Sequence, residues 1–489
     1  MEDNNKDNNF LVFLAIAIIL FIDNVDINAL NVALPIIALD IGSDISSSQW
    51  IINIYFIFSA AFFIPAGYIG DRFGLRNTLC LGVFLILLSS LFCGIADSTA
   101  FMLISRAIQG VGYAFTFSMM LLITTRLLSE KNRNIGIGIF MAVATASAMI
   151  GPILGSVITT YIGWQAIFFL NVILCVPCLI ILLNKLENYN ANKPYEVNGL
   201  IGNLLLVIGI LCAVFFAVNL SLTNDNKLKF SLFNIDSAWF FLFLACICFS
   251  TFTFLNKRLG NPIVSLGVLS NYKFVNVNIF RSLLQLTSFS LFFWMPTFFQ
   301  MGLGFSLIES GFIVTVMTFS AALFSLASGF LINKIGRHRT SVMSHLFLIA
   351  GLSSLLFNHP GYGFYHLSVA VFIIGSGLSM LYTIANSDFV ESITENYDGM
   401  FSGVYYTVSY ISGALGVFLV GIIINIYGIE FIGESFPSSA QMTTRYLNAT
   451  QVIVSSWVLL SIISLVFVSY TFRKLDQKNE GCKILLSNE

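Results

Sequence analysis

Long, uninterrupted apolar runs separated by short polar segments make up most of the chain. An α-helix of about 20 apolar residues crosses the hydrocarbon core of a bilayer, whereas strands of a membrane β-barrel alternate apolar and polar residues. The pattern therefore predicts an all-α polytopic membrane protein. We expect fourteen transmembrane helices, at residues 10–34, 48–69, 78–96, 100–126, 134–160, 165–184, 199–220, 237–256, 274–299, 309–332, 341–357, 364–388, 400–427 and 451–472.

Two polar segments, residues 185–198 and 257–273, divide these spans into six, two and six. We expect an N-terminal six-helix bundle in residues 1–184 and a C-terminal six-helix bundle with a cytoplasmic tail in residues 257–489. A linker and two interposed transmembrane helices, residues 185–256, join them. Two bundles around a cavity at the bilayer midplane are the arrangement of many secondary transporters.

Basic residues orient the spans. With the N-terminus inside, 18 of the 23 Lys and Arg residues fall in inner segments, three fall in outer loops, and Arg106 and Arg281 fall within spans. Cytoplasmic loops carry an excess of Lys and Arg, so both termini are predicted to be cytoplasmic, in a cell (inner) membrane. The polar first nine residues lack the features of a signal peptide, so we expect the first span to be retained.

The composition excludes several classes of protein. Hydrophobic residues make up 57% and charged residues 10% of the chain, whereas soluble domains carry about 25% charged residues. A soluble enzyme and a nucleic-acid-binding protein are therefore excluded. The sequence has no nucleotide-binding P-loop and no catalytic or metal-binding cluster of His, Asp and Glu. We therefore expect no enzyme activity, no metal and no cofactor.

The first span carries two acids, Asp23 and Asp26. A carboxylate inside a membrane is costly and marks a functional site by default. Residues three apart share a helix face, so burial and mutual repulsion favour proton uptake and couple the two titrations. We predict a site for a proton or a substrate cation. The alternative for Asp23 is a hydrogen bond to a neighbouring helix.

Arg106 lies in an apolar stretch of the fourth span. A buried arginine needs a partner or a watery cavity, and the face with Asp23 and Asp26 is the expected partner. Gln109, one turn further on, is expected to share its hydrogen bonds. The alternative is a purely structural ion pair or a clamp on backbone carbonyls.

A short segment after the second span, residues 67–76 (GYIGDRFGLR), is echoed after the second span of the last bundle by residues 329–338 (GFLINKIGRH). We predict a gating loop in the first segment, where glycines allow a tight turn and the acid pairs with a base or caps a helix N-terminus when the inner side closes. The alternative is that Arg72 and Arg76 only mark the topology. Asn333 stands where the acid would be in the second segment, so that half is expected to lack this charge latch. The predicted gating residues are Gly67, Gly70, Asp71, Arg72, Gly74 and Arg76.

The fifth span contains Gly151, Pro152 and Gly155. Proline removes a backbone hydrogen bond and kinks a helix, and small residues four apart allow close helix packing. We predict an interruption of the helix and a bend at the interface between the bundles.

Arg281 and Asp388 are further candidate charges in the last six spans. Arg281 either acts within the membrane or extends to the inner surface. Asp388 ends a span and is followed by more acids, so the alternative to a coupling role is an interfacial position.

These motifs resemble those of the major facilitator superfamily, and more narrowly its fourteen-span drug:proton antiporters of the multidrug and quaternary-compound exporter type. Residues 67–76 resemble the signature loop, residues 103–114 (LISRAIQGVGYA) the span-four motif and residues 151–155 (GPILG) the exporter motif. Residues 26–35 (DINALNVALP) and 163–172 (GWQAIFFLNV) also fit.

The resemblance implies a secondary active exporter that exchanges protons for lipophilic or cationic small molecules by alternating access. It also connects Arg106 with proton transfer. The implied partners are the small-molecule substrate, protons and the lipid bilayer, with the proton gradient as energy source and a periplasmic adaptor left open. The first alternative is a dedicated exporter of one endogenous metabolite, such as a siderophore. A remote one is a non-transporting membrane sensor or enzyme.

Overall fold

A computed structural model of the protein describes residues 2–42, 45–127, 130–187, 197–219, 237–258, 271–356, 363–392, 398–427 and 440–486. Within these ranges the chain is helical and contains no strand. The elements are α1 (Glu2–Asp40), α2 (Ile45–Phe73), α3 (Leu75–Gly94), α4 (Thr99–Leu127), α5 (Glu130–Tyr161), α6 (Gln165–Lys185), α7 (Val197–Asn219), α8 (Ser237–Arg258), α10 (Tyr272–Thr297), the π-helical η1 (Phe298–Gly302), α11 (Leu307–Ile335), α12 (Arg337–Leu356), α13 (Phe364–Ser392), α14 (Asp398–Ile426) and α15 (Ala440–Leu486).

Ten described helices are long and apolar enough to cross a membrane, and α5 and α7 contain shorter apolar stretches. The prediction of a multi-pass helical membrane protein is therefore confirmed. Helices α4 and α10 carry Arg106 and Arg281. The count of fourteen spans stays a prediction, and most of both predicted polar segments lies outside the described residues.

Local sequence signals explain where the helices begin and end. The hydroxyl of Ser306 accepts a hydrogen bond from the backbone of Glu309, whose carboxylate binds the backbone N–H of Ser306 in return. This capping box satisfies free donors at the start of α11. Gly74 (φ 92°) separates α2 from α3, and Gly336 (φ 85°) separates α11 from α12, because this backbone region favours glycine.

The structure corrects two expectations about these motifs. Gly67 and Gly70 lie inside α2, together with the backbone of Asp71 and Arg72, so Gly74 alone makes the turn in that segment. Helix α5 also continues through Pro152 and is not interrupted. A helix tolerates a proline whose lost hydrogen bond is compensated by its neighbours in a membrane protein.

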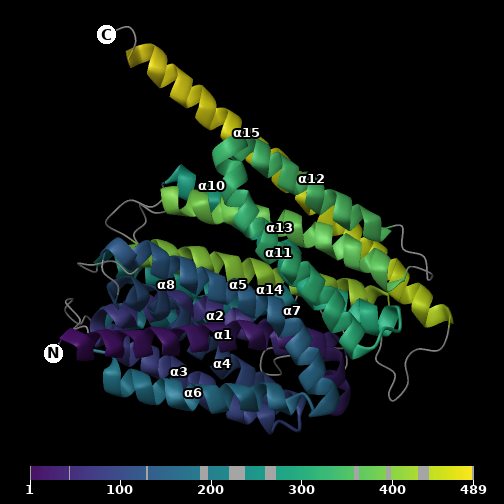
Figure 1. Cartoon of the computed structure of the whole chain (residues 1–489), viewed down its shortest axis with the longest axis horizontal. Helices are drawn as coiled ribbons and strands as arrows, with labels where there is room; N and C mark the ends of the chain where they lie inside the picture. The colour runs from purple at the N-terminus through teal and green to yellow at the C-terminus, as the bar shows by residue number, and fades with distance from the viewer. Residues whose placement is uncertain are drawn as a thin grey trace.

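The helices pack as two sets that meet along two seams. Helices α1 to α6 contact one another, as do α10 to α15, while α7 packs against α8 and α2. The seams are formed by α2 with α14 and by α5 with α11. Figure 1 shows the helices of the first set below those of the second, with the end of α15 projecting beyond the rest.

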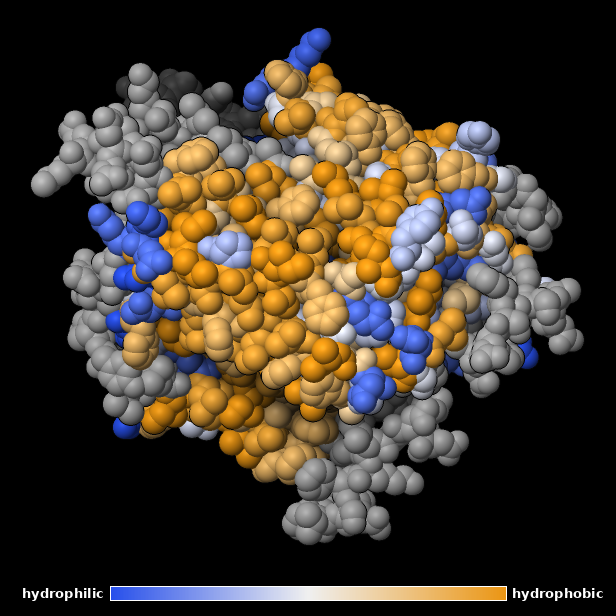
Figure 2. Space-filling view, turned by 60° about the horizontal axis from the view of Figure 1, so that its bottom comes forward, coloured by the Kyte–Doolittle hydropathy of each residue, from blue (hydrophilic) through white to orange (hydrophobic). Residues whose placement is uncertain are grey.

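Apolar side chains cover much of the outer surface. Phe330, Leu326 and Ile162 are each at least 75% exposed. Figure 2 shows a broad apolar area with hydrophilic residues gathered toward its edges. A soluble monomer rarely exposes such an area, so this surface fits contact with lipid.

Candidate functional site

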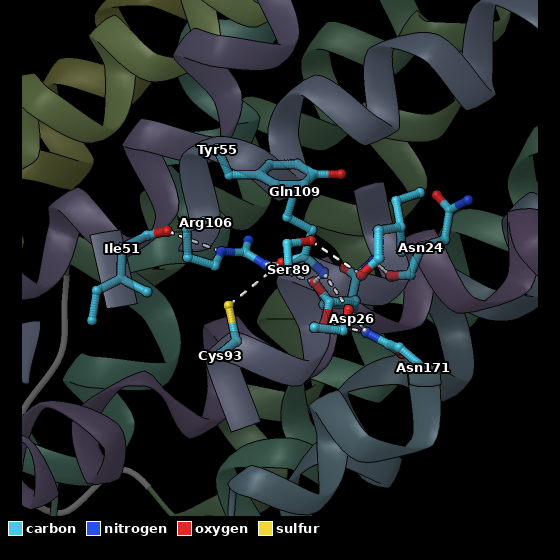
Figure 3. Close-up of polar contacts among 12 residues, drawn as sticks. Asn24, Asp26, Ile51, Tyr55, Ser89, Cys93, Arg106, Gln109 and Asn171 are labelled. Carbon is cyan, nitrogen blue, oxygen red and sulfur yellow. Dashed lines mark hydrogen bonds and ion pairs between the residues drawn. The ribbon is translucent and has the colours of Figure 1, made fainter. Parts of the chain in front are cut away.

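A buried ion pair between α1 and α4 is the centre of the candidate site. Arg106 Nη1 lies 2.7 Å from Asp26 Oδ2, and the two residues are 1% and 2% exposed. The structure thus brings Arg106 to the acidic face of α1, as the sequence analysis expected. Figure 3 shows both side chains pointing toward each other among polar residues that include Gln109 and Asn171.

Amide side chains complete the coordination of Asp26. Asn171 Nδ2, on α6, donates to Oδ1 (2.8 Å), and Gln109 Nε2 donates to Oδ2 (3.2 Å). Ser90 Oγ lies within 3.4 Å of both amide nitrogens. Both carboxylate oxygens are therefore hydrogen-bonded, which offsets part of the cost of burying the charge.

Helix α2 holds the guanidinium of Arg106 from the other side. Nε of Arg106 donates to the carbonyl of Ile51 (3.2 Å), and Cζ of Arg106 lies 4.4 Å from the centre of the Tyr55 ring. Nη1 also donates to Gln109 Oε1 (2.6 Å). Arg106 thus joins α1, α2 and α4, so a change in its charge partner would affect three helices.

Asp23 lies one turn from Asp26 and is also buried. Its Oδ2 accepts a hydrogen bond from Thr116 Oγ1 (3.3 Å), which also lies 3.0 Å from the carbonyl of Tyr113. A hydroxyl donates one proton at a time, so these two contacts compete. Asp23 is therefore held more loosely than Asp26, and its predicted alternative of bonding to a neighbouring helix is realised in this geometry.

Sequence reasoning assigned no role to Asn171, Ser90, Tyr55 or Thr116. Asn171 had a usable signal, because it is a buried amide in the otherwise apolar α6. Small hydroxyl and aromatic residues are common in membrane helices, so the other three could not be singled out before their neighbours were known.

The residues of the predicted gating segment have separate surroundings. Arg72 lies over the ring of Tyr68 (3.5 Å), and Arg76 donates to the carbonyl of Leu183 on α6. A Cβ added to Gly70 would lie 2.5 Å from the sulfur of Met119, so α2 and α4 are in close contact there, whereas one on Gly67 would meet nothing within 4 Å. The side chain of Asp71 lies outside the described part of the structure.

The exporter-like motif of α5 lies where the two helix sets meet. A Cβ on Gly151 would lie 2.7 Å from that of Asn28, and one on Gly155 would lie 2.5 Å from Ala29 Cα. On the other side, the carbonyl of Pro152 would lie 3.0 Å from a Cβ on Gly311 of α11. This segment therefore packs against α1 and α11 together.

Aromatic rings join the two sets near the middle of the helices. We use "aromatic cluster" for Phe56, Phe63, Tyr113, Phe117, Phe289, Tyr406 and Tyr410. Ring centres lie 4.3 Å apart for Phe56 and Phe289 and 5.1 Å apart for Phe63 and Tyr410, and the Tyr113 and Tyr410 hydroxyls are hydrogen-bonded (2.9 Å). Tyr55 lies 5.5 Å from Tyr113, so the cluster reaches Arg106.

Arg281 contacts residues of α13 and α14. Its Nε donates to Ser409 Oγ on α14 (3.3 Å), and its Cζ lies 4.4 Å from the ring centre of Tyr382 and 5.3 Å from that of Tyr405. Whether Arg281 acts within the membrane or extends to its inner surface stays a prediction. Arg281 points toward the interior of the C-terminal helices.

Asp388 takes part in a charged cluster at one end of α13. Arg337 Nη1 binds Asp388 Oδ1 (3.1 Å) and Glu391 Oε2 (2.5 Å), and its Nη2 binds Ser387 Oγ (3.0 Å). The hydrogen bonds from Arg337 lower the pKa of Glu391. The segment with Asn333 supplies no acid to this cluster, and its acids come from α13; the expectation that this half lacks the same charge latch stays a prediction.

Several known transporters are similar to the chain in sequence. The chain is 25% identical over 430 residues to the tetracenomycin C resistance and export protein of Streptomyces glaucescens, covering 87% of this chain and 77% of that protein. It is 23% identical over 478 residues to the riboflavin transporter RibZ of Clostridioides difficile, covering 96% and 98%. It is 24% identical over 428 residues to the multidrug transporter MdtP of Bacillus subtilis, covering 87% and 77%.

A solved POT family transporter in complex with 5-aminolevulinic acid has the same fold, with a TM-score of 0.67, 17% identity, and coverage of 94% of this chain and 96% of that one. The model of the Major Facilitator Superfamily matches residues 16–417. That match spans most of the chain and includes the ion pair and the aromatic cluster. The predicted superfamily is confirmed: the chain belongs to the Major Facilitator Superfamily and is a transporter, not an enzyme.

Proposed function

We propose that the protein is a proton-coupled exporter of lipophilic or cationic small molecules, working by alternating access. The observation that carries the proposal is the buried Asp26–Arg106 pair, which Tyr55 connects to the aromatic cluster. The export and multidrug names of several relatives support the direction of transport and the drug-like cargo.

Protonation of Asp26 would change what holds Arg106. The neutral acid no longer attracts Nη1, so the guanidinium is left with Gln109, the Ile51 carbonyl and the Tyr55 ring. Because Tyr55 contacts Tyr113, and Tyr113 is hydrogen-bonded to Tyr410, movement of Arg106 reaches the opposite helix set. Asp23 would then relay or share the proton.

We also propose the finer topology: fourteen spans in two six-helix bundles with α7 and α8 interposed, in a cell (inner) membrane with both termini cytoplasmic. The excess of Lys and Arg in the inner segments supports this orientation. In it, Arg72 and Arg76, with Asp71, latch the inner side. The proton gradient supplies the energy, with no cofactor, and a periplasmic adaptor remains an optional partner.

The test is efflux driven by a pH gradient in proteoliposomes, across a panel of lipophilic compounds. Asp26→Asn is expected to lower gradient-driven efflux at least about a hundredfold while the protein stays folded, since the amide cannot bind the proton. Asp97→Asn, the same change at an exposed residue, is the control. Normal gradient-driven efflux by Asp26→Asn would refute the proposal.

A second candidate is a dedicated transporter of one endogenous metabolite. The riboflavin transporter RibZ favours it, because that relative matches this chain over nearly the full length of both proteins. Comparing metabolite pools in cells with and without the gene separates the candidates. A single accumulating compound supports the dedicated transporter, and broad sensitivity to unrelated drugs supports the multidrug exporter.

A further inference from the structure

The C-terminal helices contain a partly buried cation, Arg281, that no described carboxylate contacts. Nη1 of Arg281 is buried and has no hydrogen-bond partner among the described residues, while Nε binds the neutral Ser409. The nearby acids Asp388 and Glu391 are bound to Arg337. Arg106, by contrast, is neutralised by Asp26. A buried guanidinium donor without a hydrogen bond is costly, so Nη1 of Arg281 is the atom at which a ligand would bind.

Aromatic rings surround this guanidinium without neutralising it. The rings of Tyr382 and Tyr405 face its Cζ, and Tyr406 and Tyr410 are close enough to interact with it electrostatically. Tyr406 and Tyr410 belong to the aromatic cluster, which joins the two helix sets. Arg281 therefore lies beside the rings that join the two helix sets.

Helix α10 continues this region as a polar stripe. Arg281, Gln285 and Ser288 are spaced by four and three residues, so they share one face. The Tyr382 hydroxyl donates to Gln285 Oε1 (2.5 Å) and is hydrogen-bonded to Ser288. One face of α10 thus combines a free cationic donor with neutral polar groups and adjoining rings.

We propose that Arg281 binds the anionic group of an aromatic cargo, a carboxylate or a similar planar oxyanion, whose ring packs on the aromatic cluster. The fork of an arginine matches the two oxygens of a carboxylate. A quaternary cation would instead be repelled at this position. The inference rests on the proposed transport function and narrows its cargo to lipophilic acids.

The experiment measures equilibrium binding to the purified full chain in lipid nanodiscs, without a proton gradient. The probes are coumarin-3-carboxylate, its carboxamide and a trimethylammonium derivative of the same ring. We expect the native protein to bind the carboxylate about ten- to a hundredfold more tightly than the carboxamide, the range of a charge-assisted hydrogen bond. Arg281→Gln should remove this preference, and Arg258→Gln, an exposed control on α8, should keep it.

If Arg281→Gln does not fold, Arg281→Lys carries the test: it keeps the charge but loses the fork, so carboxylate affinity falls and carboxamide affinity does not. Equal affinity of the native protein for both compounds, no binding of the carboxylate, or tighter binding of the ammonium compound would overturn the inference.

Gradient-driven transport is measured separately on the same panel. Carboxylate binding through Arg281 without any such transport would refute the proposed function and leave the site in place. Transport of the ammonium compound without a preference for the carboxylate would support the proposed function and refute the anion site at Arg281.

Discussion

At the residue scale, the molecule places its membrane charges in two different settings. Asp26 and Arg106 satisfy each other and are wrapped by two amides and a serine. Removing one partner of such a pair leaves the other charge buried and alone, whereas removing both can be nearly neutral. The pair is therefore suited to switching, because a proton on Asp26 changes the charge balance without removing an atom.

The pair predicts a strong non-additivity. Arg106→Gln alone is expected to destabilise the protein by about 3–5 kcal/mol, because it leaves the charge of Asp26 buried without its partner. Only a proton on Asp26 would remove that charge. The double variant Asp26→Asn/Arg106→Gln should recover most of the apparent Tm of the detergent-purified protein but none of its gradient-driven efflux. A double variant as unstable as Arg106→Gln would show that the two charges do not act as a pair.

The amide of Asn171 predicts a smaller effect on transport. Asn171→Ala removes the hydrogen bond to Asp26 Oδ1 and leaves that oxygen undersolvated, at a cost of about 1–3 kcal/mol. Gradient-driven efflux is expected to fall about tenfold or more with expression unchanged. Asn77→Ala, an exposed amide on α3, is the control. Equal efflux by both variants would remove Asn171 from the site.

Much of this site was predictable from the sequence. An acid and an arginine in apolar runs must find partners, which singled out Asp26, Arg106 and Gln109. The orientation of Arg281 was not predictable, because its depth allowed both an interior and a surface-seeking rotamer. The tyrosine rings that surround it come from α13 and α14, far away in the sequence.

At the element scale, glycines set how closely helices approach. A Cβ on Gly155 would lie 2.5 Å from the backbone of Ala29, while one on Gly329 would meet nothing within 4 Å. The sequence marked both positions in motifs but could not tell the packed glycine from the open one. The order of the helices was also predictable from the sequence, because each apolar run is long. The continuation of α5 through Pro152 was not, because it depends on the neighbouring helices.

This contrast predicts opposite outcomes for the same substitution. Gly155→Ala forces α5 away from α1 and is expected to cost about 1–3 kcal/mol, as overpacking does. Gly329→Ala is expected to be neutral or stabilising by up to about 1 kcal/mol, because alanine favours helices. Apparent Tm values of the purified variants test this. A stable Gly155→Ala protein would mean that the packing of α5 against α1 is looser than described.

The charged link between α12 and α13 predicts a pH dependence. The pKa of Glu391 is lowered in the folded protein by its hydrogen bonds with Arg337. The stabilisation is therefore present above the ordinary pKa of 4.5 and is lost as the pH falls through the lowered value. Because the Glu391 side chain is 63% exposed, solvent limits the contribution to below about 1 kcal/mol.

Replacing Glu391 with glutamine should remove this contribution. Apparent Tm is expected to drop slightly above pH 5 and to depend less on pH below it. Glu187→Gln, an exposed acid, is the matched control. An unchanged slope in Glu391→Gln would show that Asp388 alone holds Arg337.

At the scale of the whole molecule, the two helix sets are held together at the end opposite the N-terminus. Gln300 of η1 donates to the carbonyl of Val32 in α1 (3.0 Å), and Gly311 packs on the Pro152 carbonyl. Gly421 of α14 packs against the side-chain amide of Gln49 at the start of α2. These contacts come from three different helix pairs, so opening this end requires the sets to move apart as bodies.

That requirement predicts that a covalent link at this end stops transport. The side-chain amide of Gln49 lies against the position that a Cβ on Gly421 would take, so cysteines at the two positions would face each other, and a disulfide forms where their Cβ atoms come about 3.5–4.5 Å apart. Oxidation of Gln49→Cys/Gly421→Cys should reduce efflux to background, and a reductant should restore it, because alternating access needs this end to open. Each single cysteine variant, oxidised in the same way, is expected to transport normally. Full efflux by the cross-linked double variant would contradict opening at this end, since a disulfide there leaves the sets no freedom to separate.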